Sequence, residues 1–238
     1  MDMSFYSAAL AARNQQQKMN VIANDIANVN SQGYLAKNAV FTDMIYYNMK
    51  DEQPVRTPVQ AGSGAIVERT DINFDQGVLA PSDSMLDYAI VGRGFFMLED
   101  PQTGDITYTR LGNFILSDSD EGFRLASNSG KVVLDREGNH MVLNEDGDFG
   151  DAEPGIYDFP ILNGMLSVNE NELVPVEKSG EPFLSETAQL RQGFLENGNV
   201  DLADEMANVV ETSRAYAYVL KMVQTSDEIE QTINNLRA

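Results

Sequence analysis

Two heptad seams, one near each end of the chain, constrain the fold of this 238-residue sequence more than any other feature. Residues spaced alternately three and four apart share one face of an α-helix, so each seam predicts a long helix. The first helix is expected over residues 4–28, with the seam Phe5, Ala8, Ala12, Gln15, Met19, Ile22, Ile26 and Val29. The second is expected from residues 199–201 to about 236, with the seam Leu202, Met206, Val209, Ser213, Tyr216, Leu220 and Val223.

Several seam positions are small or polar, which predicts helices that need partners. Five large apolar groups in the first seam contribute on the order of 7–15 kcal/mol if they are fully buried. Ordering the backbone costs roughly 1–2 kcal/mol per residue, so an isolated helix would be marginal. We expect the helices to pair as a coiled-coil-like core and to pack against other subunits, although an intramolecular hairpin that closes the domain is the alternative.

The ends of both helices carry recognisable signals. Gly33, with residues 30–32, marks the stop of the first helix. Asn199 or Asp201 can cap the start of the second. After Val223 the second seam advances by 3, 3, 4 and 3 residues to Leu236, a stammer that predicts local overwinding.

The middle of the chain predicts an all-β domain, so the expected fold is α+β. Short apolar runs at residues 88–91, 95–98 and 131–134 are bounded by turn residues that tolerate positive φ. No helical pattern lies between them, which argues against a βαβ fold. We predict an N-terminal helix in 1–33, an extended linker region in 34–64, a β-rich middle domain in 65–190 and a C-terminal helix in 191–238.

Composition excludes several classes of partner and site. The net charge is −21, and residues 51–190 hold eight Lys or Arg against twenty-six Asp or Glu, a balance of −18. Such a surface is a poor partner for nucleic acid, which needs clustered cations. There is no Cys, no apolar run near the roughly 18 residues that a membrane span needs, and no visible cleavable signal.

Signals for catalysis are weak, and we expect no enzyme activity and no cofactor. His140, which is the single His, lies in a predicted turn without a partner nucleophile. Ser129-Gly130-Lys131 lacks the first Gly and the Ser/Thr of a phosphate loop. Gly92-Arg93-Gly94 continues into a strand, so we interpret its glycines as a bulge or a close backbone approach.

Two acidic segments, 118–122 and 144–148, place oxygen ligands at alternate positions as calcium loops do. Neither is followed by a Glu at the spacing of the twelve-residue loop, so hairpin turns explain both and we predict no metal site. The competing hypothesis is an extracellular β module that binds calcium or carbohydrate, with the helices as a dimerisation stalk. A cell-wall glycan hydrolase is a third hypothesis, without an identifiable acid/base pair.

Four blocks resemble one known family in the same order along the chain. The segment from Ala23 to Tyr34 (ANDIANVNSQGY) resembles the N-terminal signature of bacterial flagellar rod and hook proteins. Residues 86–96 and 108–114 are similar to the middle-domain motifs of the basal-body rod subclass. Residues 192–200 and 214–216 are similar to its C-terminal block.

The resemblance implies a non-enzymatic subunit of the flagellar axial structure, located in the basal body, whose terminal helices form the core and whose β domain lies outside. It implies polymerisation with itself, contact with other rod and hook proteins, and passage through the flagellar type III export apparatus. The length and the acidic middle favour the distal-rod subclass, or its close proximal-side sibling, as a torque-transmitting drive shaft for motility. Asp25, Ser31, Gly198 and Val219 depart from the family pattern. Asp25 replaces an Asn, and a cation of a neighbouring subunit or solvent would have to satisfy its charge.

The residues of interest are therefore expected at an assembly interface. The predicted interface residues are Phe5, Met19, Ile22, Asn24, Ile26, Asn28, Gly33, Met206, Val209, Tyr216, Leu220 and Ile229.

Overall fold

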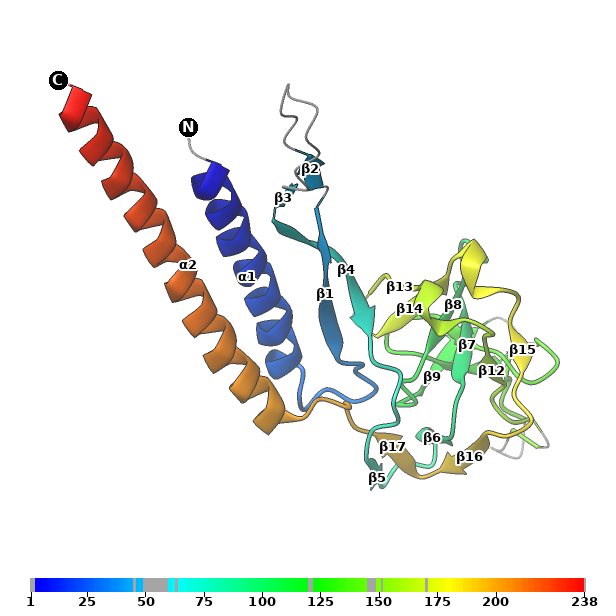
Figure 1. The fold of residues 1–238 in the computed structure, drawn as a ribbon. Coiled ribbons are helices and arrows are strands. Elements are labelled where there is room, and N and C mark those ends of the chain that lie inside the picture. Colours follow the sequence, from blue (N-terminus) through cyan, green and yellow to red (C-terminus); the bar gives the residue numbers. More distant parts are fainter. Residues whose placement is uncertain are drawn as a thin grey trace. The chain divides into compact units, whose positions relative to one another are not determined.

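The computed structural model describes residues 3–44, 46–48, 60–62, 64–119, 122–144, 149–150, 152–169 and 171–237. The fold is α+β, with a helix near each end and a mostly antiparallel β middle (Figure 1). The chain forms two compact units. The helical unit comprises residues 1–27, 37–72 and 201–238, and the β unit comprises residues 28–36 and 73–200.

Two helices and four strands make up the helical unit in the described residues. Helix α1 (Met3–Ala27) packs against helix α2 (Leu202–Arg237) and against strands β1 (Lys37–Asp43) and β4 (Ala65–Ile72). β1 and β4 are antiparallel, with a register shift between Val40 and Phe41. β2 (Tyr46–Asn48) pairs with β3 (Gln60–Gly62).

The start of α2 agrees with one of the two predicted caps. The Asp201 carboxylate accepts the backbone N–H of Ala203 at 2.8 Å and that of Asp204 at 3.3 Å. These bonds satisfy donors that the first helical turn leaves free, so Asp201 is the N-cap. Asn199, the other candidate, makes quite different contacts.

The β unit is built around one antiparallel sheet, whose main path runs β13-β14-β8-β7-β11-β10-β9. β12 pairs with β7 and with β15, while β16 pairs with β6 and β17 with β5. The strand bounds are β5 Leu79–Pro81, β6 Tyr88–Val91, β7 Phe95–Glu99, β8 Ile106–Thr109, β9 Ile115–Ser119, β10 Gly122–Ala126, β11 Val132–Val133, β12 Ile156–Asp158, β13 Met165–Ser167, β14 Glu172–Pro175, β15 Phe183–Leu184, β16 Gln189–Gln192 and β17 Phe194–Glu196. The short helices η1 (Leu162–Gly164) and η2 (Glu177–Ser179) complete it.

The core of the β unit forms where the apolar runs of the sequence meet. Its buried members are Tyr88, Ile90, Phe96, Leu98, Phe114, Leu125, Val133, Met141 and Ile156. The predicted runs at 88–91 and 95–98 are β6 and β7, and the run at 131–134 contains β11. Turn glycines 104, 122, 130 and 138 all have positive φ, as the turn chemistry requires. The predicted turn at 145–148 lies outside the described residues.

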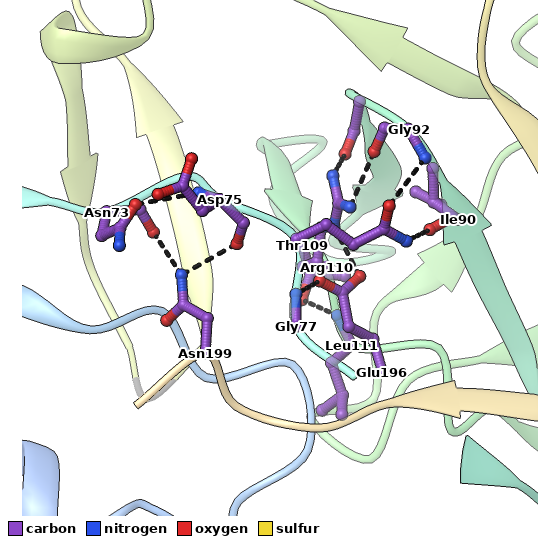
Figure 2. Close-up of polar contacts among 12 residues, drawn as sticks. Asn73, Asp75, Gly77, Ile90, Gly92, Thr109, Arg110, Leu111, Glu196 and Asn199 are labelled. Carbon is purple, nitrogen blue, oxygen red and sulfur yellow. Dashed lines mark hydrogen bonds and ion pairs between the residues drawn. The ribbon is translucent and has the colours of Figure 1, made fainter. Parts of the chain in front are cut away.

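A buried ion pair joins the end of β17 to Arg110, the residue after β8 (Figure 2). Arg110 Nε donates to Glu196 Oε2 at 2.7 Å, and the two side chains are 4% and 3% exposed. The same guanidinium donates to the carbonyl of Gly94 at 2.9 Å and to that of Gly92 at 2.7 Å. A Cβ on Gly94 would lie 2.4 Å from a methyl group of Ile156, so Gly94 allows the close approach expected for it, whereas the nearest atom to a Cβ on Gly92 would be 3.6 Å away.

The other carboxylate oxygen of Glu196 is also used. Glu196 Oε1 accepts the Gly77 N–H at 2.8 Å, and the Glu196 backbone carbonyl accepts the Gly33 N–H at 2.8 Å. Gln76 bridges the same region, donating to the carbonyl of Ile90 and accepting from Gly92. Residues distant in sequence thus converge on one paired charge, which is the condition under which a buried ion is tolerated.

A second partly buried ion pair joins β14 to the turn before β11. Lys131 Nζ donates to Glu172 Oε2 at 2.6 Å, and Ser129 Oγ donates to Glu172 Oε1 at 2.7 Å. Burial alone would raise the pKa of Glu172, but the hydrogen bonds to its carboxylate and the charge of Lys131 outweigh burial and lower the pKa below its usual 4.5.

Three expectations from the sequence need correction here. Residues 34–64 were expected as an extended linker, but they include β1, β2 and β3. Residues 65–72 form β4 and belong with the helices, not with the middle domain. His140 was expected in a turn, but it forms a β-bridge with Leu134 after the turn, and its Nε2 lies 3.0 Å from Glu99 Oε2. None of the described helices is long and apolar enough to cross a membrane.

Replacing Arg110 with Met should destabilise the β unit by about 3–5 kcal/mol, because Glu196 would remain buried without its partner charge. The matched control is Arg93→Met, since Arg93 is 63% exposed and lies 3.6 Å from Asp158. Loss of such an exposed pair should cost less than about 1 kcal/mol. Urea unfolding of both variants measures the difference, and equal losses would contradict the importance of the Arg110 pair.

Acid should weaken the β unit through Glu172. The pKa of Glu172 is lowered in the folded state, so the ionised carboxylate adds to the free energy of unfolding. This contribution is present above pH 4.5 and is lost as the pH falls through the lowered pKa. Between about pH 6 and about pH 3.5 the Tm of Glu172→Gln should therefore fall less than that of the unchanged protein. Parallel Tm curves from circular dichroism would show that Glu172 contributes nothing to acid sensitivity.

Candidate assembly interface

Helix α1 is packed on two faces, not on one. Beyond its contact with α2, it lies along β1 and β4. Asn14 Nδ2 donates to the backbone carbonyl of Ala65 in β4, and Asn14 is buried. Leu10 and Ser7 lie on the same side, next to Gly64. The predicted seam does not contain this second row.

Asp25 is the most buried residue near the end of α1, at 1% exposure. Its two carboxylate oxygens accept the backbone N–H of Lys37, at 3.2 and 3.1 Å. The sequence suggested that a neighbouring subunit or solvent would satisfy this charge. The hydrogen bond from the first residue of β1 ties α1 to β1 and gives the carboxylate a donor within the same chain.

The least exposed row of α2 is offset from the predicted seam. It consists of Glu205, Val209, Thr212, Tyr216, Val219, Val223 and Ser226, and we call it the inner row. Its spacing is 4, 3, 4, 3, 4, 3. Val223 to Ser226 is a regular step of this row, so the stammer predicted after Val223 is absent from the face that packs on α1.

Two contacts place the inner row against α1. Tyr216 and the neighbouring Ser213 line a small cavity together with Gln15, Gln16 and Met19 of α1. At the other end of the pair, burial raises the pKa of Glu205, and the nearby negative charge of Asp25 raises it further. Since Asp25 is near Glu205 and Met19 is near Tyr216, the two helices run antiparallel (Figure 1).

The inner row is a weak apolar seam. Four of its seven members are Val or Tyr, and the other three are Glu205, Thr212 and Ser226. Thr212 is 1% exposed. Within the described residues, the buried Thr212 hydroxyl has no hydrogen-bond partner. A buried unsatisfied group of this kind costs about 1–3 kcal/mol.

Two apolar surfaces on α2 are exposed in the single chain. The first, which we call the outer row, contains the predicted seam positions Leu202, Met206 and Leu220. The polar Ser213 lies between Met206 and Leu220 and also lines the cavity next to α1. The second, which we call the C-terminal stripe, contains Tyr218, Met222, Ile229, Ile233 and Leu236, each at least 47% exposed. Tyr218, Met222 and Ile229 of the stripe line a shallow groove with Lys221, Thr225 and Ser226.

The structure distributes the twelve predicted interface residues over three environments. Ile22 and Gly33 are buried. Met19, Ile26, Asn28, Val209 and Tyr216 are partly buried. The exposed members are Phe5, Asn24, Met206, Leu220 and Ile229.

Gly33 lies in the β unit and is not the residue that ends α1, which stops at Ala27. Its φ is 65°, and a Cβ there would lie 2.7 Å from the Leu111 Cα. The requirement for Gly33 is therefore a left-handed backbone and close packing on Leu111. Asn28 shapes the same turn, since its backbone carbonyl and its side-chain oxygen accept bonds from Ser31.

The predicted seam contains only Val209, Tyr216 and Val223 of the inner row. It missed Glu205, Thr212 and the buried Asn14 of α1, which are polar. The 4,3 spacing through Glu205, Thr212 and Ser226 was present in the sequence. A search for large apolar residues, however, selects the neighbouring row that carries Met206 and Leu220. Heptad spacing counted without regard to polarity would have found both rows.

Comparison with known protein families agrees with this arrangement of modules. Residues 5–34 match the model "Flagella basal body rod protein", residues 89–149 match "Flagellar hook protein FlgE/F/G D1 domain", and residues 191–236 match "Flagellar basal body rod FlgEFG protein C-terminal". The helical ends and the β middle therefore define a protein of the flagellar rod and hook class.

Individual relatives make the assignment more specific. The chain is 32% identical to the flagellar basal-body rod protein FlgG of Buchnera aphidicola subsp. Schizaphis graminum, over 93% of this chain and 95% of the relative. It is 30% identical to FlgG of Bacillus subtilis, over 98% of each, and 26% identical to FlgF of Rhizobium meliloti, over 99% and 98%. The chain belongs to the flagellar basal-body rod protein family, of the FlgG type, and is a structural subunit of the basal-body rod. The hypothesis of a calcium- or carbohydrate-binding module receives no support from these matches.

Asp25→Leu should destabilise the helical unit by about 1–3 kcal/mol, because the partly buried Lys37 N–H would lose its acceptor. Asp25→Asn is the matched control: it keeps a side-chain oxygen for that N–H and removes the charge near Glu205, so it should cost less. Chemical unfolding followed by helix circular dichroism measures both. Equal losses for Leu and Asn would contradict the role of the carboxylate as acceptor for β1.

Proposed function

We propose that the chain polymerises through its terminal helices into the distal part of the rod and there transmits torque as a non-enzymatic drive shaft. The observation that supports this most strongly is the distribution of apolar groups around α2. One side, the inner row, packs on α1, and two further sides, the outer row and the C-terminal stripe, are exposed. A helix with apolar groups on three sides suits a multi-helix tube better than a helical hairpin.

The lengths of the helices support the same proposal. α2 has 36 residues and α1 has 25, so the last eleven residues of α2 add about 16 Å. Because the helices are antiparallel, the C-terminal end of α2 continues past the start of α1, as Figure 1 shows. Ile229, Ile233 and Leu236 belong to the last nine residues of α2, spaced 4 and 3 residues apart, and no partner in the described residues buries them.

The proposed partners are neighbouring copies of this chain and, at the ends of the polymer, other rod and hook proteins. The five exposed members of the predicted interface would be covered by such neighbours. Ile22, Met19 and Tyr216 would instead keep α1 and α2 together within a subunit. Coiled-coil geometry across subunits and passage through the type III export apparatus belong to this proposal as well.

The weakness of the inner row explains why assembly would be needed to stabilise the helices. Glu205 has a raised pKa, and Thr212 buries a hydroxyl without a partner in the described residues. The α1–α2 pair therefore gains little from its own seam. Burying the outer row and the stripe would add roughly 1.5–3 kcal/mol for each large apolar side chain.

Met206→Asp should leave the monomer folded and reduce polymer formation at least about tenfold, because burying an unpaired carboxylate costs several kcal/mol. Ala207→Asp is the matched control, since Ala207 is also exposed and lies outside the inner row, the outer row and the stripe. Sedimentation of assembled protein measures polymer, and circular dichroism checks the monomer. Normal polymer from Met206→Asp would refute the outer row as an interface.

A further inference from the structure

Asn199 connects three segments of the β unit that are far apart in sequence (Figure 2). Its side-chain oxygen accepts the backbone N–H of Ala36 at 2.7 Å. Its side-chain nitrogen donates to the backbone carbonyls of Asn73 and Asp75, both at 2.9 Å. Both ends of the amide are therefore used, which only Asn or Gln can do with a single side chain.

The backbones of these segments are also bonded to one another. The Asn73 N–H donates to the Ala36 carbonyl at 2.8 Å, and the Asn199 N–H donates to the Tyr34 carbonyl at 3.3 Å. Residues 34–36, 73–75 and 199 thus form a closed set of hydrogen bonds with Asn199 in the middle. Networks of this kind strengthen their members cooperatively.

This set of hydrogen bonds lies where the chain passes between the two compact units. The chain passes between the two compact units after residues 27, 36, 72 and 200. Three of these four passages lie within one residue of Ala36, Asn73 or Asn199. The three segments joined by Asn199 are therefore the last residues of the β unit before the chain enters, or after it leaves, the helical unit.

We propose that Asn199 is a positioning residue that fastens these three connections into one cooperative joint, so that they open together and not singly. If the three segments were held independently, the hydrogen bonds of each segment would open without affecting those of the other two. A joint held by one amide keeps the ends of all three at fixed places on the β unit. The proposal concerns the isolated chain and holds whether or not the chain assembles as proposed above.

Amide hydrogen exchange of the full-length monomer tests the joint. In Asn199→Ala the Ala36 amide loses its acceptor and must exchange faster under any account. The joint predicts in addition that the Asn73 amide, whose own acceptor is untouched, exchanges at least about tenfold faster. Core amides such as those of Leu98 and Val133 should keep their rates.

Two further variants sharpen the test. Asn199→Asp keeps an oxygen for Ala36 but loses the donor to Asn73 and Asp75, so the joint predicts faster exchange at both Ala36 and Asn73. Asn197→Ala is the matched control, because the Asn197 side chain is exposed, and it should change neither amide. Acceleration confined to Ala36 in Asn199→Ala, or equal acceleration of the core amides, would overturn the proposal.

Discussion

The buried pair between Arg110 and Glu196 is the interaction on which the β unit depends most. Arg110 holds the carbonyls of Gly92 and Gly94, and Glu196 holds the N–H of Gly77 and, through its backbone, that of Gly33. Glu196 is also the last residue of β17, three residues before Asn199. The charge pair therefore fixes the strand from which the chain continues to the joint and then to α2.

The helical unit differs from the β unit, because part of its apolar surface stays exposed to solvent in the single chain. α1 is covered on two faces, by α2 and by β1 and β4, and its most buried polar groups have partners there. α2 has one modest inner row and two exposed apolar surfaces. One chain thus combines a β unit that has its own apolar core with a helix whose exposed apolar groups could be buried by neighbouring subunits. This is expected for a subunit of a polymeric rod.

The features that depend on residues close together in the sequence could be predicted from the sequence. The turn glycines, the runs at 88–91 and 95–98, and the Asp201 cap follow from positive φ, strand patterning and capping. Contacts across long sequence separations could not be predicted. Gly33 was interpreted as a helix stop, yet its constraint is Leu111, 78 positions away in a different segment. Asn199 was interpreted as a possible cap, yet it bonds to residues 36, 73 and 75. The inner row was only partly identified because polar residues interrupt it, and the family resemblance does not distinguish one face of α2 from another.

The central claim is that the exposed apolar groups of α2 are covered by neighbouring subunits. Amide hydrogen exchange of the full-length protein, measured as dilute monomer and as assembled polymer, tests it most directly. The account predicts that amides of residues 227–237 exchange rapidly in the monomer and at least about tenfold more slowly in the polymer, while core amides of the β unit exchange equally in both. Equal protection of residues 227–237 in monomer and polymer would contradict it.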